Sequence, residues 1–120
     1  MQIIVTTTDT FWNEAKAKGI YTRSTIDSAL EDVGFIHATL PEQTTDMLNR
    51  HFVNRDDVRL LQVEEARIKS EVKFEKPLSG RDELFPHIYG PLNIDAVVGT
   101  IKPAKDTNGH FIRPKELDTT

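Results

Sequence analysis

Short apolar runs, separated by polar and turn-forming segments, predict a chain of strands and helices. Residues 3–5 and 58–63 are rich in β-branched and aliphatic side chains, so we expect each run to form a buried strand. Residues 72–75 alternate between apolar and polar positions, as a half-buried strand does. Residues 96–101 carry the clearest strand pattern of the C-terminal half, and residues 111–112 are expected to close the sheet.

Helical signals lie mainly in the first half of the chain. Asp9 or Thr10 is expected to cap a first helix, which ends where Gly19 can adopt a left-handed conformation. Residues 24–33 place apolar side chains at near-helical spacing and predict a second, short helix. Because helices come early and strands late, the order of elements favours an α+β fold.

The third helix carries the strongest local signal. Thr39 and Glu42 have the spacing of a capping box, and Pro41 stands just inside the expected helix start. His37 ends the preceding strand, so it lies next to a helix N-terminus, where free backbone N–H groups favour an anion. The sequence therefore predicts that the start of this helix holds a phosphate.

Length and charge restrict the class of protein. A chain of 120 residues fits one domain, expected over residues 1–114 and followed by a loose tail over residues 115–120. The formal net charge is -4 and no basic stripe interleaves with aromatic residues, so nucleic acid is not an expected partner. No run approaches the length of a membrane span and cysteine is absent, so we expect a cytoplasmic protein without disulfides.

Two histidines occupy short apolar runs that read as buried strands. His37 lies in Gly-Phe-Ile-His-Ala-Thr at residues 34–39, and His87 in Phe-Pro-His-Ile-Tyr-Gly-Pro-Leu at residues 85–92. A buried imidazole without a hydrogen-bond partner costs about 1–3 kcal/mol, so the two rings predict a shared polar pocket. Either ring can move a proton or orient a ligand. The alternative is a pair of core histidines bonded to the backbone.

The second histidine belongs to a strand with further candidate residues. His87 and Tyr89 are two positions apart, so both should point to one face while Ile88 points to the core. Gly90 follows, where the missing side chain would let a ligand approach the backbone. The pair can stack on an aromatic ring and donate hydrogen bonds, or it can serve the fold alone.

The two histidine motifs together resemble one family. Residues 34–39 and 85–92, with the spacing of Trp12, Gly19 and Tyr21 and the pair at residues 74–75, resemble the DUF952 family of small bacterial and plant proteins. The resemblance extends from the first strand to residue 111. It implies an α+β fold with a mixed sheet, related to the ADP-ribosyltransferases, which handle NAD or transfer ADP-ribose. The family has no established activity, so the likeness implies a fold more firmly than a function.

One departure from the ADP-ribosyltransferases concerns the first strand. Sites of that kind generally hold the nicotinamide-side ribose with a histidine or another polar residue on this strand. Here residues 3–6 read Ile-Ile-Val-Thr and offer no histidine, which argues against ordinary NAD-dependent transfer. Binding of a nucleotide-like ligand, such as NAD or ADP-ribose, stays open, and the sequence establishes no cofactor.

Our leading hypothesis is a pocket for a small anionic ligand, with transfer or hydrolysis at a ribosyl or phosphoryl group if the protein is an enzyme. His37 or His87 would move a proton and Glu75 would stabilise positive charge on ribose. The spacing of the histidines gives no support for a metal site, even with Glu75 as a third ligand. The candidate ligand-binding residues are Tyr21 over a nucleobase, Arg23 at a phosphate, Thr39, Gln43, Tyr89 and Gly90.

Two rival hypotheses remain. The chain can be a non-catalytic module that keeps the fold and binds a ligand or a partner without turnover. It can also use both histidines only to knit a polar core, in which case their replacement would lower stability and leave binding unchanged.

Overall fold

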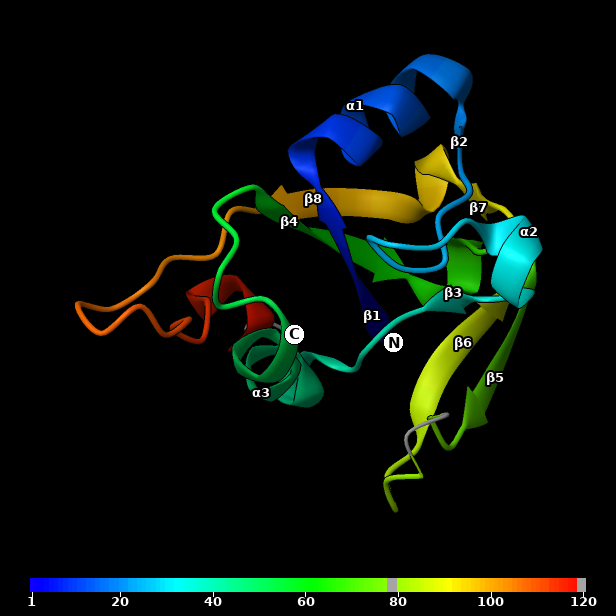
Figure 1. The fold of residues 1–120 in the computed structure, drawn as a ribbon. Coiled ribbons are helices and arrows are strands. Elements are labelled where there is room, and N and C mark those ends of the chain that lie inside the picture. Colours follow the sequence, from blue (N-terminus) through cyan, green and yellow to red (C-terminus); the bar gives the residue numbers. More distant parts are fainter. Residues whose placement is uncertain (78–79, 119–120) are drawn as a thin grey trace.

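The computed structural model describes residues 1–77 and 80–118 and shows an α+β fold, as expected. The helices α1 and α3 lie on opposite sides of the first strand, β1 (Figure 1). The elements are β1 (Gln2–Thr8), α1 (Asp9–Lys18), β2 (Ile20–Tyr21), α2 (Leu30–Val33), β3 (Ile36–His37), α3 (Pro41–His51), β4 (Val58–Glu64), η1 (Glu65–Arg67), β5 (Glu71–Glu75), β6 (Phe85–Tyr89), β7 (Leu92–Asn93), η2 (Ile94–Ala96), β8 (Val97–Ile101) and η3 (Lys115–Asp118).

The strands of the described residues form three small sheets, with the orders β1-β4-β8, β2-β7 and β3-β6-β5. Every strand pair in them is antiparallel, which corrects the expectation of a mixed sheet. Parallel neighbours need a long crossover connection within one sheet. The helix α1 does not provide one, because it leads from β1 into β2, which belongs to a different sheet.

Both faces of β1 are covered, which explains its continuous apolar run. Ile3 and Val5 pack with Ala15 of α1 in one core cluster. Ile4 points the other way and packs with Leu48 of α3 in a second cluster. A strand that is buried on both faces has no polar alternation, so the sequence signal was an unbroken aliphatic run.

The expected second helix is reduced to the single turn α2. Before it, the backbone N–H groups of Ser24 and Thr25 both bond to the carbonyl of Ser28, and the Thr25 hydroxyl accepts from the N–H of Asp27. Short polar side chains of this kind compete with helical hydrogen bonds. They hold residues 24–28 in a compact turn instead.

The C-terminal segment differs from expectation in two places. Phe111 closes no sheet; it makes an isolated bridge with Lys105, and the Asn49 side chain bonds its backbone N–H and carbonyl to α3. The expected loose tail forms η3 over part of its length. Its Leu117 is 2% exposed and packs in the core cluster that contains Ile4 and Leu48. The rest of that expected tail, residues 119–120, lies outside the described residues.

The cap of the first helix lies one residue before the nearer of the two expected positions. The hydroxyl of Thr8, rather than Asp9 or Thr10, accepts from the Phe11 N–H at 3.2 Å, and Gly19 ends the helix at a φ of 85° as predicted. Asp9 is instead bonded to Arg59 and Lys102. Within the described part of the chain, no helix combines the length and the apolar character that a membrane span needs.

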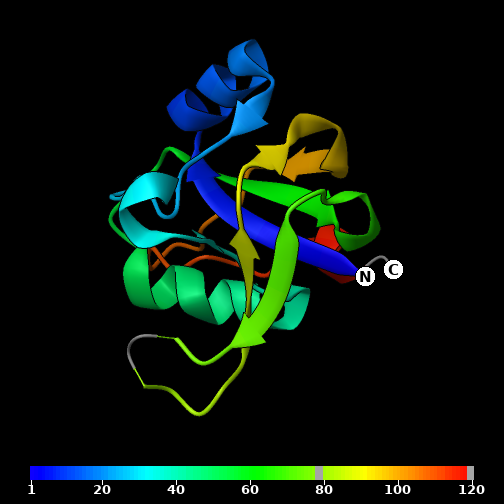
Figure 2. The same ribbon diagram turned by 90° about the vertical axis from the view of Figure 1, so that its right-hand side faces the viewer.

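Two connections place α3 beside the sheet of β3, β6 and β5. Ile4 and Thr39 exchange backbone hydrogen bonds of 2.8 Å, which joins β1 to the segment that leads from β3 into α3. Figure 2 shows the described part of the connection between β5 and β6 passing along α3, where Gln43 bonds to Glu83 and Leu84. A hollow remains between these elements.

Candidate functional site

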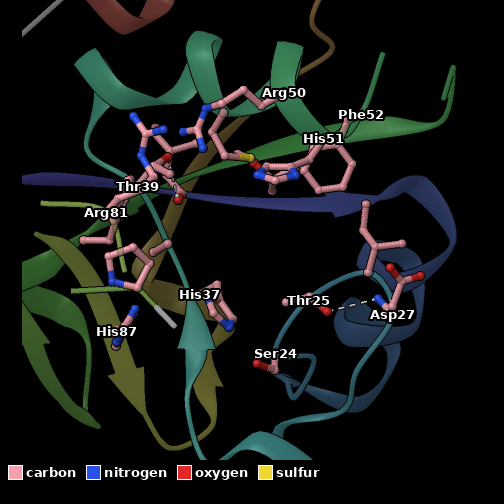
Figure 3. A pocket seen from close by; sticks show the side chains of 17 residues that line it. Ser24, Thr25, Asp27, His37, Thr39, Arg50, His51, Phe52, Arg81 and His87 are labelled. Atoms are coloured by element: carbon pink, nitrogen blue, oxygen red, sulfur yellow. Dashed lines mark hydrogen bonds between the residues drawn. The ribbon is translucent and has the colours of Figure 1, made fainter. Parts of the chain in front are cut away.

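The hollow is a cavity of about 440 Å³ between β1, the paired ends of β3 and β6, α3 and the turn at residues 24–27. Figure 3 shows His37 on β3 and, across the cavity, Arg50 and His51 on α3. Apolar side chains, among them Ile26 and Phe85, form much of the wall. The volume lies within the range of small-molecule sites, about 300–1,000 Å³.

The two predicted histidines meet at this cavity. His37 and His87 stand directly opposite each other in the antiparallel pairing of β3 and β6. Their rings are 5.4 Å apart, and Phe35 stacks on His87 at 4.1 Å with an interplanar angle of 17°. Residues fifty positions apart in the chain therefore share one wall, as the sequence predicted.

His87 is 2% exposed, and one of its ring nitrogens is firmly held. Its Nδ1 lies 2.9 Å from Oε1 of Glu75, and the hydroxyl of Tyr89 donates to the same carboxylate oxygen. These bonds, first that of Tyr89 and then that of His87, hold the pKa of Glu75 below its usual value. The other ring nitrogen, Nε2, is buried and finds no hydrogen-bond partner among the described residues.

His37 has a different environment from its neighbour. The ring is half-buried, and no hydrogen bond to it occurs within residues 1–77 and 80–118. Its backbone N–H donates to the carbonyl of Ser24 at 3.0 Å, which fixes the turn at residues 24–27 beside the ring. Burial, and then the nearby His87, lower the pKa of His37 below its usual value. The ring therefore favours its neutral form.

Cationic side chains line the opposite side of the cavity. Arg50 bonds to Asp46 at 2.9 Å, and Arg81 reaches the same carboxylate at 3.9 Å and Glu83 at 3.5 Å. His51 lies on the same stretch of α3. Two guanidinium groups beside one another form a suitable place for a phosphate or carboxylate.

Sequence reasoning missed these arginines, His51 and four further polar residues of the cavity. Met47, Arg50 and His51 have the spacing of one helix face, so a closer reading of α3 could have grouped them. Arg81 lies in a loop, where no periodicity exists to reveal its direction. The other polar residues that the sequence did not single out are Thr6, Ser24, Thr25 and Asp27.

The prediction that Thr39 and Glu42 form the capping box of α3 is wrong, and the start of α3 is therefore not the anion site that we expected. Gln43, not Glu42, bonds to the free backbone N–H at the helix start, accepting from Leu40 at 2.9 Å. The hydroxyl of Thr39 lies 2.8 Å from that of Thr44, so it is engaged although Thr39 lines the cavity. The second half of α3, rather than its N-terminus, supplies the positive charge that faces the cavity.

Three candidate ligand-binding residues lie away from the cavity lining. Tyr21 is 1% exposed in the core, where burial raises the pKa of its hydroxyl to about 12. Arg23 lies over the ring of Phe11 at 4.2 Å and donates to the carbonyl of Ile26. Gln43 is occupied by the bonds to the start of α3 and to the loop before β6. The structure therefore gives these three residues structural contacts.

The remaining candidates lie behind His87. Glu75 and Tyr89 do not line the cavity. Glu75 contacts the His87 ring directly, and Tyr89 is linked to that ring only through its bond to Glu75. Gly90 has a φ of 148°, and an added Cβ would come within 2.5 Å of the Ser70 hydroxyl. Ser70, and not a ligand, is the close neighbour of that glycine. Within the described residues, no three His, Asp or Glu side chains are placed to hold a metal ion.

Comparisons with known proteins agree with the family resemblance. The model of the family described as "Protein of unknown function (DUF952)" matches residues 6–100. The X-ray crystal structure of protein CC0527 from Caulobacter crescentus is 29% identical, with a TM-score of 0.82 over 98% of this chain and 99% of that one. The solution NMR structure of CC0527 gives 28% identity and a TM-score of 0.74, over 91% and 90% of the two chains. A search of curated proteins found no match.

Proposed function

Because the chain belongs to the DUF952 family, whose description assigns no function, we propose a function from the geometry of its cavity: it binds a small anionic ligand of the nucleotide type. The observation that carries this proposal is the buried Nε2 of His87, which has no partner in the part of the chain that the structure describes, although its ring lines a cavity with two arginines. An unsatisfied buried polar atom costs about 1–3 kcal/mol, and a ligand group would supply the missing bond.

The walls of the cavity suit the parts of a nucleotide. Arg50 and Arg81 would bind the phosphate, since guanidinium groups match its oxygens in charge and geometry. Ile26 and Phe85 offer apolar surface to a ring. A relation to the ADP-ribosyltransferase-like fold is part of the proposal and makes NAD and ADP-ribose the first ligands to test.

Catalysis would use His87 as the proton acceptor. As the oxygen of a water or hydroxyl forms a bond to ribosyl carbon or phosphorus, Nε2 would take its proton, and the leaving group would depart with the electron pair of the broken bond. Glu75 would act on this step through the ring, because it contacts Nδ1 and not the cavity.

Isothermal titration with NAD, ADP-ribose and AMP tests the proposal. We expect binding to at least one of them, weakened about tenfold or more when Arg50→Ala and Arg81→Ala are combined. Arg67→Ala, an exposed arginine on η1, is the matched control and should leave binding unchanged. A folded wild-type protein that binds none of the three ligands would contradict the proposal.

A non-catalytic binding module is the second candidate function. The side chains of β1 that line the cavity are Ile4 and Thr6, so this strand provides no histidine for the ribose of NAD. Incubation with each bound ligand, followed by chromatography of the products, separates the two functions. Binding without product formation assigns the chain to the non-catalytic class.

A further inference from the structure

The environment of His87 determines which of its nitrogens carries the proton. An ionised carboxylate can only accept hydrogen bonds. Glu75 Oε1 receives the Tyr89 hydroxyl and lies 2.9 Å from Nδ1 of His87, so Nδ1 must be the donor in that second contact. In a neutral imidazole only one nitrogen carries hydrogen, and Nε2 is then left with its lone pair.

Two further contacts keep the ring in this orientation. Phe35 stacks on one face of His87 at 4.1 Å, which prevents the ring from turning over freely. Glu75 comes from β5, the neighbour of β6 in the sheet, and its side chain is partly exposed although it does not line the cavity. The carboxylate can therefore stay ionised while the imidazole it holds is buried.

The geometry points to Glu75 as a positioning residue that presents Nε2 of His87 as a hydrogen-bond acceptor, so that the cavity selects anionic ligands bearing a hydroxyl group that can donate to it. The selection of ligands rests on the proposed binding function, whereas the tautomer of His87 does not. A ligand of the same charge without that donor would leave Nε2 unpaired and would bind less tightly.

Other polar atoms of the cavity fit a hydroxylated ligand. Across residues 1–77 and 80–118, the buried hydroxyl oxygens of Thr6 and Ser24 have no partner, and both residues line the cavity together with His87. Each hydroxyl can donate or accept. Three unpaired polar atoms in one cavity match a ligand with several hydroxyl groups better than one that carries only an anion.

Nitrogen NMR on labelled, ligand-free protein tests the positioning role directly. At about pH 8, where an ordinary imidazole is neutral, we expect a protonated Nδ1 and an unprotonated Nε2 in His87. Glu75→Ala removes the acceptor and should shift the ring toward the tautomer with hydrogen on Nε2. Glu75→Gln keeps one acceptor oxygen and should restore the wild-type tautomer, and Glu71→Ala, on the same strand, should not alter it.

Titration with AMP and with its analogue lacking both ribose hydroxyls tests the selection. We expect wild-type protein to prefer AMP by about three- to tenfold, the value of one ordinary hydrogen bond. The preference should fall below about twofold in Glu75→Ala and persist in Glu71→Ala. Circular dichroism of each variant checks that it is folded.

The two experiments fail independently. A proton on Nε2 of wild-type His87 at that pH, or an unchanged tautomer in Glu75→Ala, overturns the role of Glu75 whatever the ligand results are. Equal affinity for AMP and its analogue overturns the selection. If neither nucleotide binds, and NAD and ADP-ribose do not bind either, while the expected tautomer is seen, the proposed binding function fails and the positioning role of Glu75 is upheld.

Discussion

At the scale of single residues, the two imidazoles of the cavity differ in their hydrogen bonding. His87 is held by Glu75 and stacked by Phe35, whereas His37 is half-buried and its ring makes no hydrogen bond to any described residue. Burial without such a partner disfavours the charged form of His37, and its pKa is lowered. This difference makes stability depend on pH.

We expect the free energy of unfolding to fall as the pH drops below about 6.5. In that range the unfolded chain binds a proton at His37, while the folded chain, whose lowered pKa is reached only at more acid pH, does not. The contribution of His37 to stability is complete above its pKa in the unfolded chain, and it is lost as the pH falls from that value through its lower pKa in the folded chain. Urea unfolding of wild type, His37→Gln and the exposed control His110→Gln measures it; an equal slope with pH in all three would contradict the assignment.

Gly90 has a conformation that other residues adopt only with strain. Gly90→Ala would place its Cβ at a φ of 148° and 2.5 Å from the Ser70 hydroxyl, so we expect a loss of about 1–3 kcal/mol in thermal or urea unfolding. Gly99→Ala is the matched control. Its Cβ would meet only the mobile end of Gln62, and its change should stay within about 0.5 kcal/mol.

At the scale of elements, the start of α3 shows how a side chain can link two segments. Gln43 accepts from the backbone N–H of Leu40 and donates to the carbonyl of Leu84 at 2.9 Å. One amide group therefore satisfies the helix start and ties the loop before β6 to the helix. The same loop carries Arg81 to the cavity.

Replacement of Gln43 should therefore destabilise more than replacement of Glu42. We expect Gln43→Ala to lower the free energy of unfolding by about 1–2 kcal/mol, since two backbone groups lose their partner. Glu42→Ala, one position earlier and exposed, removes only a charge near the helix start and should cost a few tenths to about 1 kcal/mol. Urea unfolding of both variants decides between the two caps; a larger loss in Glu42→Ala would favour the box that the sequence predicted.

Sequence patterns predicted the elements whose signal is local. The aliphatic run at residues 58–63 became β4, and Gly19 ended α1, because burial and backbone conformation leave direct marks in the sequence. The cap of α3 was missed because Thr39 and Gln43 both have suitable side chains. Which of the two side chains caps the helix depends on their contacts with Thr44 and Leu84, and these contacts are formed only in the packed structure.

At the scale of the whole molecule, the C-terminal segment belongs to the core. Leu117 of η3 is buried in the cluster that also holds Leu48 of α3 and Ile4 of β1. The polar composition of residues 115–120 suggested a loose tail. One aliphatic side chain in a polar stretch gives no periodic signal, so only tertiary packing reveals its burial.

Leu117→Ala should leave a cavity in this cluster and lower the free energy of unfolding by about 2–4 kcal/mol. Ile112→Ala is the control, since that side chain is 50% exposed and its loss should change stability by no more than about 0.5 kcal/mol. Thermal unfolding of both variants gives the comparison. Equal melting temperatures would show that η3 does not contribute to the core.

The candidate site was only partly predictable for the same reason. His37 and His87 were found because an imidazole in an apolar run requires an explanation by itself. Arg50 and Arg81 look like ordinary surface arginines, and only the fold brings them to one cavity. Glu75 was expected at the ribose, whereas its contact through Nδ1 depends on the alignment of β5 and β6.

The facing pair in β3 and β6 has a consequence for how the chain reaches its native state. Ile36 opposes Ile88 one step before the imidazoles oppose each other. A slip of one of these short strands by a single residue would reverse the faces of its side chains, so that its isoleucine would point into the cavity and its imidazole would lie among aliphatic side chains. An NMR magnetisation transfer between the two rings would therefore report correct strand alignment, and it can be measured during refolding without a ligand.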